Sequence, residues 1–215
     1  MEAVTQQPDS TQISVLYEDD LLLVCVKPSG ILSAADASGK PSLPSLLSPR
    51  RVFPVHRLDY EVCGVMVFAK TAQAAAVLSA QIGSCFVKEY LAVCETPPSF
   101  PEGELRDLLY HDRTRNKTYI VQRQRNGVRE ASLTFRVLHD CLLFVRLQTG
   151  RTHQIRVQLA SRGCPLRGDR KYGAKTTGQL ALWAWRLSFR HPDGRQLAFT
   201  LPSAFLPPDL EAPFV

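Results

Sequence analysis

Short apolar runs, separated by turn-forming residues, set the pattern of hydrophobic positions along this chain. The first run, Leu21–Val26, is wholly apolar and is followed by Lys27-Pro28-Ser29-Gly30, which is typical of a turn. Runs of about four to eight apolar residues between turn signals fit strands better than helices, because helices need a longer periodic stretch. The strands predicted in this way are Leu21–Val26, Val65–Phe68, Tyr90–Val93, Ala131–Leu138, Leu142–Gln148, Leu182–Phe189 and Gln196–Thr200.

Tight turns join two pairs of these strands, and one helix is predicted between the second and third. His139-Asp140 and His191-Pro192-Asp193-Gly194 each fit a hairpin connection. Thr71 can cap a helix that runs to about Ile82 and ends at Gly83. The expected buried side of this helix consists of Ala74, Val77, Leu78 and Ile82.

Strands that pair as hairpins, with few helices between them, predict an α+β fold. We expect a single domain with a largely antiparallel mixed sheet and an active-site cleft across it. A dinucleotide-binding fold is excluded, since the chain has no Gly-x-Gly-x-x-Gly and no regular alternation of strands and helices. The domain is expected to span residues 13–215, after a flexible tail over residues 1–12, and its Pro-rich end, residues 202–215, is expected to lie extended.

Composition narrows the cellular setting and the chemistry. Hydrophobic residues make up 45% and charged residues 21% of the 215 residues, which suits a globular protein with a sizeable core. The six cysteines form no Cys-x-x-Cys pair, which argues against a metal site and favours reduced thiols. The polar start of the chain is no signal peptide, and no apolar run reaches the roughly 20 residues of a membrane span. We therefore predict a cytoplasmic protein without a metal, cofactor or membrane partner.

Basic residues are concentrated in two parts of a chain whose net charge is +6. The segment 113–129 has no acidic residue, and glutamines, asparagines and a tyrosine alternate with its cations. A solvated charged surface would explain such clusters, but two clusters of one sign favour a nucleic-acid partner. In the first cluster we predict RNA contacts from Arg113, Arg115, Lys117, Arg123 and Arg125; the second consists of Arg162, Arg167, Arg170, Lys171 and Lys175.

Three separated stretches carry the residues best suited to catalysis on a phosphate-bearing substrate. They are His56-Arg57-Leu58-Asp59, Lys88-Glu89-Tyr90 and Gly150–Arg156. Asp59 precedes a predicted strand, which places it on a loop held by the sheet, although a structural salt bridge would also account for it. Tyr90 is either a core tyrosine or an aromatic surface on which a base can stack, with a hydroxyl that can act as acid or base.

Arg156 is the predicted partner of Asp59. A short helix is expected over Gln154–Ser161, with Thr152 as its cap, so that Arg156 lies close to an apolar face and needs a partner. A pairing with Asp59 would lower the pKa of that carboxyl group by roughly one to three units. The alternative is an arginine that only stabilises the helix end. Arg151 and His153 lie at the helix start, where backbone N–H groups can hold phosphate.

The chain resembles the RluA-type pseudouridine synthases. The resemblance rests on the three stretches above, in this order, together with further motifs on either side of them. These are Tyr17-Glu18-Asp19-Asp20, Val26-Lys27-Pro28-Ser29-Gly30, Gly64, Phe68-Ala69-Lys70, Gly168-Asp169, Tyr172-Gly173 and Ala184-Trp185-Arg186-Leu187.

The resemblance implies that the protein isomerises uridine in RNA, detaching uracil from C1′ and reattaching it through C5. It implies that Asp59 is the essential carboxylate, attacking the ribose or assisting through C2′, and that Arg156 holds it ionised. Tyr90 would contact the uracil and help to move the C5 proton, and Arg57 would enter the RNA stack. His56, Arg151 and His153 are further expected RNA contacts. No cofactor is implied, and the expected partner is ribosomal or transfer RNA, bound by a monomer.

The chain departs from the family pattern at a few positions. Val62-Cys63 replaces Thr-Ser before Gly64, and Gln158 and Trp183 replace common histidines. No S4-like RNA-binding domain is expected before Tyr17, so the segment 113–129 is predicted to help recognise RNA. A module that binds RNA without turnover remains an alternative, and a basic interaction protein without an RNA role is a more distant one.

Overall fold

A mixed β-sheet forms the framework of the protein in the computed structural model, which describes residues 13–208 and residue 210. Within this part of the chain the strand order is β1-β2-β4-β10-β5-β9-β8-β6-β7, with β3 beside β4 and β11 beside β10. Only β4 and β10 pair in parallel, so the predicted α+β fold with a largely antiparallel mixed sheet is confirmed. The strands are β1 (Val15–Glu18), β2 (Leu22–Lys27), β3 (Phe53–Pro54), β4 (Cys63–Ala69), β5 (Val87–Val93), β6 (Glu102–Asp112), β7 (Lys117–Val121), β8 (Val128–His139), β9 (Leu142–Leu147), β10 (Leu182–Arg190) and β11 (Gln196–Thr200).

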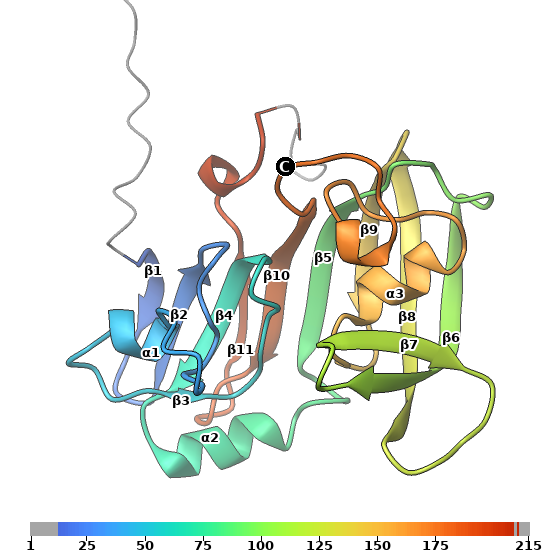
Figure 1. The fold of residues 1–215 in the computed structure, drawn as a ribbon. Coiled ribbons are helices and arrows are strands. Elements are labelled where there is room, and N and C mark those ends of the chain that lie inside the picture. Colours follow the sequence, from blue (N-terminus) through green and yellow to red (C-terminus); the bar gives the residue numbers. More distant parts are fainter. Residues whose placement is uncertain (1–12, 209, 211–215) are drawn as a thin grey trace, which may run out of the picture.

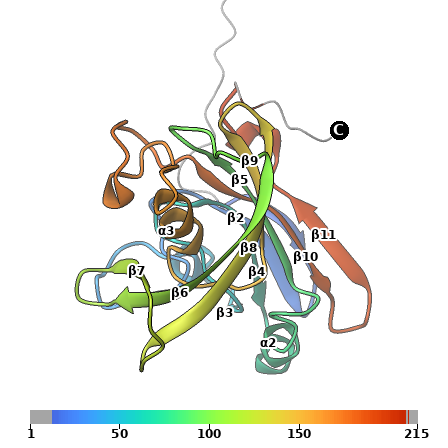
Figure 2. The same cartoon turned by 90° about the vertical axis from the view of Figure 1, so that its right-hand side faces the viewer.

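The sheet is strongly twisted, and its two ends lie on opposite sides of β5. In Figure 1, β1, β2, β4, β10 and β11 stand on one side, while β6, β7, β8 and β9 stand on the other. Figure 2 shows β6 and β8 crossing the direction of the strands behind them, which is the accumulated right-handed twist of a large sheet. The helix α3 (Gln154–Ala160) contacts β6 and β7.

Both faces of the central strands are covered, which explains why β4, and β2 up to Val26, consist of apolar residues. All residues of β2 and β4 are buried. Met66 and Phe68 of β4 belong to one hydrophobic core, and Val65 and Val67 to the other, because successive side chains of a strand point to opposite faces. The first core also holds Ile155 of α3, so it supports the helix that carries Arg156.

The helix α2 (Ala72–Ser79) is shorter than predicted. The Thr71 hydroxyl accepts a hydrogen bond from the Ala74 N–H at 3.1 Å, so the predicted cap is confirmed. Ala74 and Leu78 are buried as expected. Val77 and Ile82 are instead 39% and 43% exposed, because the helix ends before Ile82 and covers β4 with a narrow strip. The other short helical segments are α1 (Leu43–Leu46) and the single turns η1 (Arg170–Tyr172) and η2 (Ser203–Phe205).

The basic segment 113–129 contains a strand that the sequence pattern did not predict. β6 and β7 form a hairpin that ends the sheet, and their buried residues are sparse because one face meets solvent. The predicted hairpins at Asp140 and Gly194 are confirmed by the pairing of β8 with β9 and of β10 with β11.

The Pro-rich end differs from the expected extended form. Ser203–Phe205 makes a helical turn, η2, and Leu206 behind it is buried. Burial of apolar side chains, rather than the proline content, therefore determines the backbone path of this stretch. The predicted tail over residues 1–12 lies outside the described residues, as do residue 209 and residues 211–215.

Candidate active site

The loop that carries Asp59 lies between β3 and β4 and is fastened to the turn after β2. Gly30 N and Lys27 Nζ donate to the Tyr60 carbonyl oxygen at 2.9 and 3.1 Å, and Ser29 Oγ donates to the Glu61 carbonyl oxygen at 2.8 Å. Two successive backbone carbonyl groups of the loop are thus held by one turn. The Asp59 carboxylate is free to point away from that turn, and its side chain is 21% exposed.

The ammonium group of Lys27 is fully buried under the Asp59 loop. It also donates to the carbonyl oxygens of Pro28 and Ile31, both at 2.8 Å. Burial lowers the pKa of Lys27 to about 8, while the nearby Cys63 and Asp59 oppose this shift. Lys27-Pro28-Ser29-Gly30 is therefore more than a turn between strands, because its lysine supports the loop of the candidate catalytic carboxylate.

The segment before α3 is held by the Gln154 side chain. Gln154 Oε1 accepts from Thr149 Oγ1 at 2.7 Å and from Arg151 N at 3.0 Å, and Gln154 Nε2 donates to the Ser132 carbonyl oxygen at 3.0 Å. The predicted cap by Thr152 is wrong. His153 is the residue before the helix, in a left-handed conformation with φ of 54°, and its side chain makes no capping bond.

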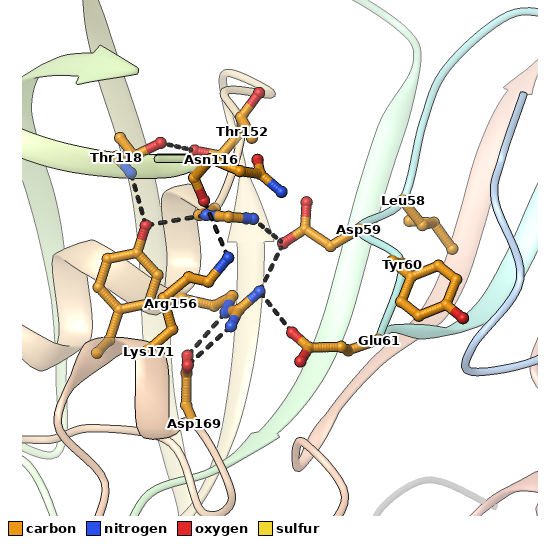
Figure 3. Close-up of polar contacts among 12 residues, drawn as sticks. Leu58, Asp59, Tyr60, Glu61, Asn116, Thr118, Thr152, Arg156, Asp169 and Lys171 are labelled. Carbon is orange, nitrogen blue, oxygen red and sulfur yellow. Dashed lines mark hydrogen bonds and ion pairs between the residues drawn. The ribbon is translucent and has the colours of Figure 1, made fainter. Parts of the chain in front are cut away.

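Three carboxylates surround the guanidinium of Arg156 (Figure 3). Arg156 Nη1 lies 3.5 Å from Asp59 Oδ2, so the predicted meeting of these two residues is confirmed. The stronger partner is Asp169, which accepts from Arg156 Nε at 2.7 Å and from Nη2 at 2.8 Å. Glu61 Oε2 lies 3.0 Å from Nη1. Arg156 and Asp169 are both buried, and this two-point contact fixes the plane of the guanidinium.

Arg156 lowers the pKa of Asp59, as predicted, but burial outweighs this effect and the net shift is upward. Burial raises the pKa of the Asp59 carboxyl group above its ordinary value, and the charge of Asp169 adds to this. The charge and hydrogen bond of Arg156 and the backbone N–H of His153 lower the pKa without compensating for burial. The sequence could not indicate this balance, because burial depends on how closely the Asp59 loop packs against His153 and Arg156.

Tyr90 lies on β5, is 6% exposed, and lines the same cavity as Asp59. Burial and the negative charge of Asp59 both raise the pKa of its phenol. The hydroxyl therefore stays protonated near neutral pH and is a donor rather than a base. Tyr90 also belongs to the hydrophobic core, in agreement with its interpretation as a core tyrosine, and its stacking on a base stays a prediction.

One cavity of about 380 Å³ brings the three predicted stretches together. It lies within the size range of a small-ligand site. Residues of the Asp59 loop, of β5 and of the segment before α3 all contribute, in agreement with the expected cleft across the sheet. The lining residues are Val55, His56, Arg57, Leu58, Asp59, Val62, Ile82, Lys88, Tyr90, Leu147, Gly150, Arg151, Thr152, His153, Gln154, Ile155, Arg156 and Leu182.

The two histidines that were expected to contact RNA are buried in the cavity wall. His56 Nε2 accepts from Val67 N at 3.2 Å, and His153 Nδ1 lies 2.9 Å from the Tyr172 hydroxyl. Burial lowers the pKa of each imidazole to about 3, with smaller effects from Lys88 on His56 and from Arg156 on His153. Both are neutral near pH 7, so they cannot serve as cations for phosphate. Their contact with RNA stays a prediction.

Most of the predicted RNA-binding cations lie at the surface, and two of them border this cavity. Arg57 and Arg151 are exposed and line it. Arg113, Arg115, Arg123 and Arg125 are exposed on the turns that flank β7, and Lys117 is half-buried. The hairpin of β6 and β7 is fastened beside the site, since Thr118 Oγ1 donates to the Thr152 carbonyl oxygen at 2.8 Å and Lys171 Nζ donates to the Asn116 carbonyl oxygen at 3.0 Å (Figure 3).

Asp169 and Tyr172 are site residues to which the sequence assigned no role. Tyr172 accepts from Thr118 N at 2.8 Å and contacts His153, so it joins the hairpin to the segment before α3. Both belong to the motifs Gly168-Asp169 and Tyr172-Gly173, which were noted only as part of the resemblance. No group of three or more potential metal ligands, and no helix long and apolar enough to cross a membrane, occurs in residues 13–208 and 210.

Comparisons with known proteins agree on one family. A family model described as RNA pseudouridylate synthase matches residues 21–161. The uncharacterized RNA pseudouridine synthase YhcT of Bacillus subtilis is 32% identical over 209 residues, covering 89% of this chain and 68% of that protein. Ribosomal large subunit pseudouridine synthase D of Xanthomonas campestris is 34% identical over 233 residues, covering 95% and 69%.

A solved structure gives the same result for the fold. Human RNA pseudouridylate synthase domain containing 1 superimposes with a TM-score of 0.78 at 21% identity, covering 97% of this chain and 90% of that one. The matched family model covers the Asp59 loop, Tyr90 and Arg156. The chain therefore belongs to the RNA pseudouridylate synthase family.

Proposed function

We propose that the protein isomerises uridines in RNA to pseudouridines, with Asp59 as the essential carboxylate. The observation that carries this proposal is the position of Asp59, 3.5 Å from a fully buried arginine and in one cavity with Tyr90. The reaction breaks the N1–C1′ bond of uridine, turns the uracil and forms the C5–C1′ bond, while the proton on C5 is lost and N1 regains one. Nothing is oxidised or reduced, and the chain needs no external group donor.

Asp59 acts in its ionised form, either by attacking C1′ or by assisting departure of the base through C2′. Both routes need the ionised carboxylate. Burial opposes this ionisation, because it raises the pKa of Asp59. Arg156 supplies the compensating charge, and Asp169 holds that arginine in one orientation. The cost of burying the acid is thus partly offset by a preorganised cation, which is the arrangement expected of an electrostatically tuned site.

Tyr90 contacts the uracil ring within the cavity. Its raised pKa makes the phenol a poor base, which favours contact and hydrogen-bond donation over removal of the C5 proton. Arg57 enters the RNA stack where the target nucleotide leaves it. Extrusion is needed because the glycosidic bond is inaccessible in a stacked helix, and it costs a few kcal/mol.

RNA is bound along the surface around the cavity by Arg57, Arg151 and the exposed arginines that flank β7. His56 and His153 contribute neutral contacts. Ribosomal and transfer RNA are both candidate substrates, and the names of relatives that act on the large ribosomal subunit favour ribosomal RNA. We further propose that residues 13–215 form one catalytic domain that works as a monomer in the cytoplasm.

The proposal is tested with total cellular RNA that carries tritium at C5 of its uridines. The RNA comes from cells that lack this gene, so that its target sites are unmodified. Wild-type protein is expected to release tritium as water, and Asp59→Ala is expected to release none while binding RNA as before. Binding without release by the wild-type protein would show a module that binds RNA without turnover, and equal release by both proteins would remove Asp59 from its role.

A further inference from the structure

Lys88 faces the active-site cavity from β5. It lies two residues before Tyr90, so both side chains point to the same side of the strand, and both line the cavity. Glu89 points to the opposite side, where Arg146 and Arg186 lie 3.1 and 3.0 Å from its carboxylate oxygens. The acid next to Lys88 in the sequence is therefore occupied elsewhere.

The ammonium group of Lys88 has no anionic partner in the described part of the chain. No carboxylate of residues 13–208 or 210 lies within ion-pair distance of it, and Nζ donates no hydrogen bond to those residues. Its charged neighbour is another cation, Arg151. Burial and Arg151 both lower the pKa of Lys88, and Lys88 in turn lowers the pKa of His56. A half-buried cation beside a second cation is unfavourable unless an anion joins them.

Gly150 provides the space for this ammonium group. A Cβ atom on Gly150 would lie 2.5 Å from Lys88 Nζ, which is closer than atoms of this kind approach. Gly150 does not have a positive φ, so its backbone conformation is open to other residues. Room for Lys88 is the local reason for a glycine here, directly before Arg151.

We propose that Lys88 and Arg151 bind a phosphate group of the target nucleotide at the wall of the cavity. This inference rests on the proposed function, because the ligand is taken to be RNA. A nucleotide whose ribose reaches Asp59 brings its own phosphates to the walls of the same cavity, and phosphate is the anion that every nucleotide of RNA carries. Lysine is an effective point charge for phosphate. The pair thereby fixes the backbone of the strand while Asp59 and Tyr90 act on the sugar and base.

The first test measures RNA affinity without turnover. Asp59→Ala, with and without Lys88→Gln, is titrated with a fluorescent ten-nucleotide oligouridine between about 50 and 200 mM salt. Lys88→Gln is expected to weaken binding about tenfold or more, the effect of losing a charge-assisted hydrogen bond. The slope of log affinity against log salt should fall by about 0.7, the value for one contact to single-stranded RNA.

Lys175→Gln is the matched control. Lys175 belongs to the second basic cluster, for which no RNA contact is proposed. It is exposed, and its backbone N–H donates to Glu95 beyond the far end of β5, so the same charge is removed about 20 Å from Lys88. The affinity of this variant should stay within about twofold of its parent. Equal affinities and salt slopes for Lys88→Gln and Lys175→Gln would overturn the proposal.

Gly150→Ala provides a second variant that keeps every charge. The added methyl group displaces the Lys88 ammonium, which is the flexible end of a long side chain, so the fold should tolerate it. Gly150→Ala is expected to weaken oligouridine binding severalfold, and to add little when Lys88 is already glutamine. Fully additive losses would contradict a shared site. Thermal unfolding of each variant checks that its fold is intact.

Competition identifies the ligand group. Uridine, uridine 5′-monophosphate, uridine 3′-monophosphate and inorganic phosphate are each used to displace oligouridine. One of the two monophosphates should compete better than uridine, and Lys88→Gln should remove that advantage. An unchanged advantage, or competition by inorganic phosphate alone, would contradict the assignment. These measurements use a protein without turnover, so their outcome is independent of tritium release. A negative result here would contradict the phosphate site alone, and absence of tritium release would contradict the proposed function alone.

Discussion

Replacing Asp169 with asparagine separates the orientation of Arg156 from its charge. Asp169 and Arg156 are both buried and share two short hydrogen bonds. Removing one partner of such a pair costs roughly 3 to 5 kcal/mol of folding free energy. We expect about 3 kcal/mol, since Arg156 keeps Asp59 and Glu61 as neighbours. A domain stable by about 5 to 15 kcal/mol would remain folded at room temperature.

Two opposite effects on catalysis follow from the same change. Arg156 loses its fixed plane, so the isomerisation rate at neutral pH should fall about a hundredfold, the effect of a shift of about 1 Å in a catalytic group. The charge of Asp169 also raises the pKa of Asp59, so its removal lowers that pKa. Because Asp59 acts as a carboxylate, the acid limb of the pH–rate profile should move to lower pH.

Tritium release measured across the acid range, together with thermal unfolding, checks both effects. Asp107→Asn is the matched control, because Asp107 binds Arg162 just beyond α3 and Gln158 within it. That variant should lose less stability and keep the wild-type rate and acid limb. A wild-type rate for Asp169→Asn, or an acid limb that moves to higher pH, would refute the reasoning.

Further predictions concern the base of the loop, the phenol and the RNA-binding surface. In the unfolded chain Lys27 keeps its proton up to its ordinary pKa of 10.5, whereas in the folded protein Lys27 loses its proton above about pH 8. The free energy of unfolding should therefore rise over this range by up to about 3 kcal/mol, and urea titrations of Lys27→Met should lack this rise. Tyr90→Phe should lose less than about tenfold in tritium release, and a loss of more than about a hundredfold would instead assign proton transfer to the phenol. Arg123→Ala combined with Arg125→Ala should weaken binding of unrelated RNAs alike and reduce the salt slope by about 1.5, whereas loss for one sequence alone would indicate base recognition.

Local sequence signals predicted the central strands of the sheet and two of its hairpin turns, but not β1, β3, β6 or β7. The runs that became β2 and β4 are buried on both faces, so they are apolar throughout and easily recognised. The hairpin at Asp140 and the cap at Thr71 are set by residues next to one another in the sequence. β7 was missed because it lies at an end of the sheet, where one exposed face admits the basic residues of the segment 113–129.

The sequence predicted the main residues of the site, but not the ion-pair partner of Arg156 or the direction of the Asp59 pKa shift. Asp59 and Arg156 meet as expected, but the stronger partner of Arg156 is Asp169, which reaches it from the loop after α3. That contact depends on how the loop turns at η1, which no local pattern reports. The pKa of Asp59 depends on its burial between segments that are distant in the sequence. His153, in a left-handed conformation, precedes the helix in place of the expected cap Thr152, and its side chain contacts Tyr172, a residue from another loop.

The most direct test of the account is a single-turnover measurement with Asp59→Asn. This change keeps the shape of the side chain and removes only its charge. The account predicts folded protein that binds C5-tritiated RNA and releases no tritium within a time that brings the wild-type reaction to completion. Tritium release by Asp59→Asn at a rate near that of the wild-type protein would contradict the assignment of Asp59 as the carboxylate that carries the reaction.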